Sequence, residues 1–300
     1  MLPRLVRSCA PALALAVAVA TPGRAQTTHA VFVGIDDYIE FGEEAGGDLL
    51  GAERDARIMR EVLAERWGLD RGNTLMLLGR EATKEAIREA ILGWLAPRAG
   101  PLDLALFYFA GHGSQVFDLD GDEPDGLDET LAPTDVLPLS SANDIRDDEL
   151  RAWLAAVGTD VVVILDSCHS GTATRASGMR TRSLQRAPPA EGGREPTSLA
   201  PGSDRQSMAD AGTNILELAA AAPHEAALEG PVSEEALASV EYGGMFTRYL
   251  VEALGRASAE VTYAEVLRQV AERLDYEELG QSPQLTGEGA KALFVPPGRR

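Results

Sequence analysis

The chain has 300 residues, of which 45% are hydrophobic and 25% are charged. Acidic residues outnumber basic ones by 47 to 27, so the formal net charge is −20. A surface of this sign repels nucleic acid and anionic membranes, which argues against both as partners and favours cationic substrates or divalent cations.

The first 25 residues have the pattern of a secretory signal peptide. Arg4 and Arg7 precede a short apolar run at 10–20, and Ala25 stands before the expected cut at Gln26. The run is too short to cross a bilayer, and no later stretch is long and apolar enough to do so. We therefore expect export to the periplasm or the medium; the alternative is an uncut N-terminal anchor.

The number of cysteines points to a reactive residue. Removal of residues 1–25 takes Cys9 away and leaves Cys168 as the one cysteine of the mature chain. Exported proteins normally hold cysteines in disulfides, so a single one is a candidate reactive thiol. A small buried hydrophobic residue is the alternative interpretation of Cys168.

Apolar strands alternate with amphipathic helices through the first part of the chain. The pattern predicts helices at 48–67, 83–95 and from about 147 to 157, and strands at 30–35, 74–78, 102–110 and 161–165. Strands with almost no polar face are typical of a parallel sheet that helices cover on both sides.

Residues 172–212 interrupt this alternation. They are rich in Ser, Thr, Pro, Gly and Ala, carry six arginines and lack apolar periodicity, which predicts a flexible linker. A strand at 214–221, helices at 246–254 and 263–274 and a closing strand at 290–295 are expected beyond it. We therefore expect one α/β domain over 26–300, in which the linker joins a large-subunit-like part to a small-subunit-like part.

Two predicted strands end in polar clusters, Gly-His-Gly-Ser at 111–114 and Asp-Ser-Cys-His-Ser-Gly at 166–171. In open parallel sheets, functional residues lie at the carboxyl ends of the strands. We therefore expect the two clusters to lie close together. A thiol nucleophile needs a base within hydrogen-bond reach. Cys168 is the predicted nucleophile and His112 its base, because His112 arrives from a separate strand end. The backbone N–H groups of Gly113 and Cys168 are predicted to stabilise the oxyanion.

The two clusters resemble the catalytic signature of caspase-like cysteine peptidases, most of all metacaspases and their bacterial relatives. Further similar runs stand at 33–38, 50–56, 243–247 and 281–284, so the resemblance covers almost all of 29–295. It implies a three-layer α/β caspase-like fold with a mainly parallel, six-stranded sheet. It also implies an endopeptidase with a Cys168–His112 dyad, a thioester intermediate and no organic cofactor.

The resemblance further implies a substrate preference. Asp55 and Asp166 match family positions that line an acidic pocket for the residue before the cleaved bond, which implies cleavage after Arg or Lys. Carboxylates pair with guanidinium groups in bidentate geometry, in agreement with that role. The alternatives are an exposed helix charge for Asp55 and a turn-forming role for Asp166. Since exposed linkers are preferred sites of nicking, we expect self-cleavage there, after Arg175, Arg180, Arg182 or Arg186.

Calcium is expected to be dispensable. Asp147 and Asp148 match part of the family's calcium site, but 172–175 contain no acid where a further one is expected. The acidic run at 118–129 departs from the EF-hand pattern, since Glu123 stands where the loop glycine belongs. A solvated acidic loop is the commoner outcome. We expect no required cofactor and at most a weak calcium site.

Three other roles stay open. A catalytically silent binding or scaffold protein would keep the fold, although an intact Cys168 and His112 argue against it. An α/β-hydrolase would use Ser167 or Ser170, but neither stands in the Gly-x-Ser-x-Gly pattern. A calcium-binding module is the third. We expect a monomer that acts on peptides or proteins with a basic residue before the cleaved bond, without nucleic-acid or membrane partners.

Overall fold

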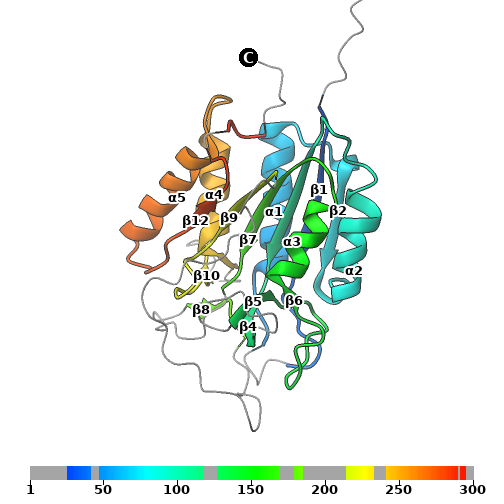
Figure 1. Ribbon diagram of the computed structural model, residues 1–300. Helices are drawn as coiled ribbons and strands as arrows, with labels where there is room; N and C mark the ends of the chain where they lie inside the picture. Colours follow the sequence, from blue (N-terminus) through cyan, green and yellow to red (C-terminus); the bar gives the residue numbers. More distant parts are fainter. Residues whose placement is uncertain are drawn as a thin grey trace, which may run out of the picture.

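The computed structural model describes residues 26–41, 47–117, 127–168, 179–184, 214–232, 241–289 and 291–294. A six-stranded sheet forms its centre, in the order β12-β9-β7-β3-β1-β2 (Figure 1). The strands are β1 (Thr28–Gly34), β2 (Thr74–Leu78), β3 (Leu104–Ala110), β7 (Asp160–Asp166), β9 (Ile215–Ala219) and β12 (Gln284–Thr286). All neighbours pair in parallel except β12, which is antiparallel to β9. The mainly parallel α/β sheet expected from the sequence is confirmed.

Helices cover both faces of this sheet, which gives three layers (Figure 1). One face carries α1 (Ala52–Trp67), α4 (Met245–Arg256) and α5 (Tyr263–Tyr276). The other carries α3 (Asp147–Ala155) and α2 (Lys84–Glu89), which continues as a π-helical stretch at Ala90–Leu95. Alternate residues of each strand point to opposite faces. In β1, Ala30 and Phe32 therefore join one core, and Val31 and Val33 join the other.

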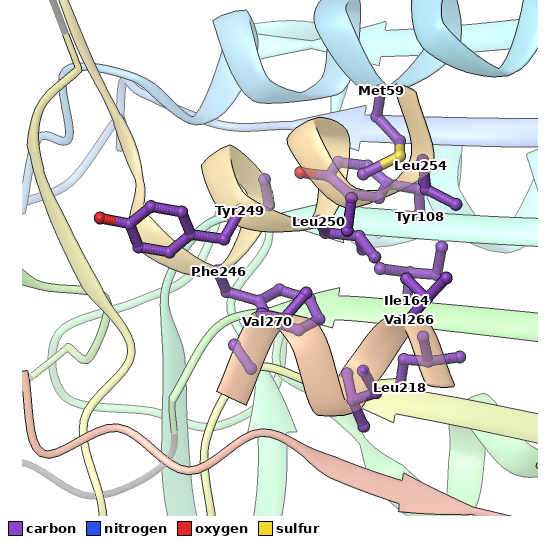
Figure 2. Close-up of a cluster of buried hydrophobic side chains, with 14 of the residues drawn as sticks. Met59, Tyr108, Ile164, Leu218, Phe246, Tyr249, Leu250, Leu254, Val266 and Val270 are labelled. Atoms are coloured by element: carbon purple, nitrogen blue, oxygen red, sulfur yellow. The ribbon is translucent and has the colours of Figure 1, made fainter. Parts of the chain in front are cut away.

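The core under α4 and α5 ties the second part of the chain to the first (Figure 2). Side chains from both helices, from α1 and from three strands meet there: Met59, Tyr108, Ile164, Leu218, Phe246, Leu250, Leu254, Val266 and Val270. Full burial of one such side chain stabilises a fold by about 1.5–3 kcal/mol. The segments on either side of residues 172–212 therefore share one hydrophobic core, and their association does not depend on the linker.

Two small three-stranded sheets lie at the carboxyl ends of the parallel strands (Figure 1). One consists of β4 (Gly113–Phe117), β5 (Leu127–Leu131) and β6 (Ile145–Arg146). The other consists of β8 (Arg180–Thr181), β10 (Leu228–Pro231) and β11 (Tyr242–Gly244). The sequence does not predict these strands, because four of them have only two to four residues and the other two, of five residues, mix polar with apolar side chains.

The C-terminal end differs from the expectation. The sequence predicts a closing strand at 290–295, but the sixth strand of the sheet is β12. Residues 291–294 instead make turns, with one isolated bridge between Ala292 and Thr262. The prediction is wrong because the apolar character of this stretch has another cause: Leu293 is buried in the core beside α5.

Two expectations concern residues outside the described ranges. The expected signal peptide, 1–25, is one, and most of the expected linker, 172–178 and 185–212, is the other. Among the helices that the structure describes, none has the length and apolarity of a membrane span.

Candidate active site

His112 lies two residues after the end of β3 and is held on two sides. Its backbone N–H donates to the Tyr38 hydroxyl at 2.6 Å, and the two rings lie 4.9 Å apart. Its ring Nε2 lies 2.8 Å from the carbonyl oxygen of Gly47. Since a carbonyl only accepts, Nε2 carries the proton and Nδ1 is the basic atom. Burial lowers the pKa of His112 to about 4, so the imidazole is neutral at pH 7.

Cys168 follows β7 and is also buried. Its Sγ lies 3.8 Å from the carbonyl oxygen of Ala227, to which the thiol donates. Burial raises the pKa of Cys168 to about 12. The structure thus holds a neutral thiol and a neutral imidazole, and the Nδ1 atom of His112 has no hydrogen-bond partner among the described residues.

Residues 179–184, here called the β8 segment, lie across the ends of β3 and β7. The carbonyl oxygen of Arg182 accepts from the N–H of Gly113 at 3.0 Å and from the N–H of Cys168 at 3.1 Å. Its own N–H donates to Ala227 at 2.9 Å, and β8 pairs antiparallel with β10. The two N–H groups that the sequence assigns to an oxyanion therefore hold one peptide carbonyl. In these six residues the expected flexible linker has a defined place.

The side chain of Arg182 is completely buried and faces three carboxylates. Its Nη2 lies 2.5 Å from Asp55 and 3.6 Å from Glu229, and its Nη1 lies 2.9 Å from Asp166. The sequence predicts Asp55 and Asp166 together in such a pocket, and the structure brings them together. The buried position of Asp55 excludes an exposed helix charge.

Glu229 is a member of this pocket that sequence reasoning missed. It is fully buried on β10, and its Oε1 accepts from the N–H of Leu50 at 2.9 Å. One signal was available, an acidic residue inside the short, mostly apolar run at 226–230. That signal has no meaning until β10 is placed beside the β8 segment.

The N-terminus of α4 holds the two pocket aspartates. The N–H of Gly244 donates to Asp55 at 2.7 Å, and Thr247 donates to Asp166 from its N–H at 3.2 Å and from its hydroxyl at 2.6 Å. The Tyr108 hydroxyl lies 2.6 Å from Thr247 Oγ1 and completes the chain of hydrogen bonds. Free N–H groups at a helix N-terminus stabilise anions. The second part of the chain therefore positions pocket carboxylates that belong to the first.

Charge in the pocket is concentrated and buried. Burial raises the pKa of Asp55 to about 7; the Arg182 cation opposes this rise and the Asp166 charge adds to it. Burial raises the pKa of Glu229 as well. For Arg182, burial alone would lower the pKa, but the facing carboxylates outweigh it and hold the pKa above its ordinary value. An arginine side chain has several donors in one plane and can serve several carboxylates at once.

The other predicted residues lie elsewhere. Arg180 is exposed, and its Nη1 donates to the carbonyl oxygen of Asp48 at 3.1 Å. Arg175 and Arg186, with Ser170 and the acidic residues at 118–126, lie outside the described residues.

The two residues proposed for calcium share an arginine partner. Asp147 lies 3.3 Å and Asp148 2.6 Å from the guanidinium of Arg151. In the described part of the chain, no group of three His, Cys, Asp or Glu side chains is arranged to hold a metal ion. Calcium independence stays a prediction.

Comparisons with known proteins agree with the resemblance noted in the sequence. The family model for the caspase domain of peptidase family C14 matches residues 27–294. Metacaspase-1 of Pyricularia oryzae is 35% identical over 152 residues, which are 48% of this chain and 36% of that protein. Metacaspase-1A of Aspergillus oryzae is 35% identical over 156 residues, 49% of this chain and 35% of that protein. The matched region therefore spans about a third of the length of these relatives.

Two solved structures are similar along most of the chain. Protein GSU0716 from Geobacter sulfurreducens has a TM-score of 0.61 and 25% identity, and the match covers 90% of this chain and 99% of that one. Caspase-1 from Spodoptera frugiperda has a TM-score of 0.55 and 15% identity, with 94% and 99% covered. The second likeness is one of fold.

Proposed function

This chain belongs to the caspase domain family of cysteine peptidases, and from that premise we propose that it is an endopeptidase that cleaves after arginine. The observation that carries the proposal is the placement of Arg182. Its carbonyl oxygen rests on two N–H donors, one of them from Cys168, while its side chain fills a buried acidic pocket. These contacts support the Arg182–Ser183 bond as one that the enzyme cleaves.

His112 and Cys168 would perform the reaction as a general base and a nucleophile. His112 Nδ1 takes the thiol proton as Sγ attacks the carbonyl carbon before the cleaved bond. The N–H groups of Gly113 and Cys168 hold the resulting oxyanion. His112 then gives the proton to the leaving amine, which yields a thioester and the first product. Water, deprotonated by His112, hydrolyses the thioester and restores the thiol.

The neutral state of both groups supports this order of events. With the pKa of Cys168 raised to about 12 and that of His112 lowered to about 4, a preformed thiolate–imidazolium pair is disfavoured. Proton transfer and attack would therefore occur together, once Sγ turns from Ala227 toward the substrate carbon.

The pocket supports arginine over lysine and over aspartate. An aspartate would add a fourth carboxylate to three that are already buried, at a high cost in electrostatic energy. A lysine ammonium has three donors at one point, whereas the pocket carboxylates approach two separate nitrogens of Arg182. This order of preference can be measured with peptides that place Arg, Lys or Asp before a reporter group. The assays are run with and without calcium.

The same geometry supports self-processing, and among the four candidate arginines we propose Arg182. Arg180 is its matched control, because it lies two residues away and its side chain is exposed. We expect mass spectrometry to find cleavage after Arg182 in the purified wild type and in Arg180→Gln. We expect none at this bond in Cys168→Ala or Arg182→Gln.

Two results would overturn this assignment. One is a wild type that stays intact at Arg182 under conditions in which it cleaves arginine peptides. The other is cleavage after Arg182 in the Cys168→Ala protein. If the wild type cleaves neither itself nor any peptide, a silent caspase-like scaffold becomes the better account.

A further inference from the structure

The β8 segment continues past Arg182 along an edge of a second small sheet. Ser183 forms a parallel bridge with Gly113, and the N–H of Leu184 donates to the carbonyl oxygen of Gly113 at 2.9 Å. Gly113 belongs to β4, whose other edge pairs with β5. Both backbone groups of Gly113 are therefore used by the segment: its N–H by Arg182 and its carbonyl by Leu184.

The Leu184 side chain enters the interior. It is 5% exposed and belongs to the core on the α2 and α3 face of the sheet. Leu131, which pairs with Gly113 from β5, belongs to the same core. On the other side of the Arg182–Ser183 bond, Arg180 is exposed and its place on β10 is set by backbone pairing. Of the two described residues after the bond, both are buried, and Leu184 is the apolar one.

Resting on the proposed function, we propose that the enzyme has an apolar subsite for the second residue after the cleaved bond. A peptide that adds a strand to a sheet edge gains affinity from backbone hydrogen bonds, and pockets for alternate side chains give selectivity. Here β10 receives the residues before the bond and β4 those after it. Leu184 marks the pocket, so favoured substrates carry arginine with a large aliphatic residue two positions later.

Four peptides that share the same arginine test the subsite separately from the arginine pocket. The parent peptide copies residues 179–186 with both flanking arginines replaced: Met-Ala-Thr-Arg-Ser-Leu-Gln-Ala, between a fluorophore and a quencher. Two others replace the leucine by serine or aspartate. The fourth exchanges neighbours, as Met-Ala-Thr-Arg-Leu-Ser-Gln-Ala, and so keeps the composition and apolarity of the parent. All four are assayed with the purified wild type, with Cys168→Ala as the blank.

We expect the parent to exceed the other three by about tenfold or more in kcat/KM, a usual size for discrimination in an apolar pocket. Equal rates for the parent and the exchanged peptide would overturn the subsite and leave arginine cleavage intact. Failure to cleave any of the four would overturn the proposed function, and the subsite with it. In the full chain, Leu184→Asp should slow self-cleavage after Arg182, and Leu184→Met should restore it; equal rates for both would contradict the subsite.

Discussion

The acidic pocket and the proposed catalytic pair, Cys168 and His112, both lie beside Arg182, yet they tolerate burial in opposite ways. The pocket buries three carboxylates around one guanidinium and adds hydrogen bonds from Gly244, Thr247 and other N–H donors. The pair buries a neutral thiol and a neutral imidazole, and the Nδ1 atom of His112 has no hydrogen-bond partner among the described residues.

This difference has a functional consequence. Buried charges are tolerated only when they are paired, so the pocket needs a cation and thereby selects one. A neutral base without a partner remains free to accept a proton. Binding selectivity and chemistry are therefore separable, and substitutions in the two regions should separate them in kinetics.

The largest effect is expected at the catalytic pair. Cys168→Ala and His112→Ala should each lower kcat/KM by more than about a thousandfold, because among the described residues of the site no other side chain is a thiol or an imidazole. His224 is exposed in a turn, so His224→Ala is the matched control and should retain activity. Circular dichroism checks the fold of each variant. Substantial hydrolysis by either pair variant would remove the dyad.

Loss of one pocket carboxylate should act through selectivity. Asp166→Asn removes a charge that pairs with the arginine at 2.9 Å. Breaking a buried ion pair costs about 3–5 kcal/mol, so cleavage after arginine should fall about a hundredfold or more. The rate at which a small thiol-reactive alkylating reagent modifies Cys168 should change little, since that reaction needs no arginine. A parallel fall in both rates would mean that Asp166 supports the catalytic pair instead.

Adding one methyl group inside the pocket should also weaken cleavage after arginine, but by less. A Cβ at Gly244 would lie 2.1 Å from an oxygen of Asp166 and 2.6 Å from Nη1 of Arg182. Gly244→Ala should therefore raise KM for arginine peptides about tenfold, since overpacking of this size costs about 1–3 kcal/mol. Gly255 lies near the end of α4, the helix that Gly244 precedes, and has open space around it, so Gly255→Ala is the control. Equal KM values for the two variants would contradict the pocket.

The smallest expected effect is a pH dependence that belongs to the pocket alone. The pKa of Asp55 is raised to about 7, and its carboxylate form is the one that pairs with arginine. As pH falls from 8 to 6, Asp55 takes up a proton, and kcat/KM for arginine peptides should fall severalfold, at most about tenfold per unit. The pKa values of His112 and Cys168 lie outside this window. Asp55→Asn should flatten the profile, and an unchanged slope in that variant would refute the assignment.

Sequence patterns predicted much of the fold and the two polar clusters of the candidate site. Long apolar strands of five to seven residues, such as β3 and β7, carry their own signal, and the two polar clusters that follow them lie at strand ends where chemistry is expected. His112, Cys168 and Asp166 stand in these clusters, whereas Asp55 lies in α1 and was named only through the family resemblance. The strands β8, β10 and β12 were not predicted, because two to four residues give too little pattern.

The sequence by itself therefore determined the class of sheet and the two predicted catalytic residues, since each depends on a local run of residues, and the family resemblance pointed to two of the three pocket acids. Only the tertiary structure decided which of four candidate arginines fills the pocket, that Glu229 joins it, and that α4 holds its aspartates. These contacts join residues 127 positions apart for Arg182 and Asp55 and 189 apart for Gly244 and Asp55. No local periodicity carries such a pairing; packing of the two parts of the chain around one core produces it.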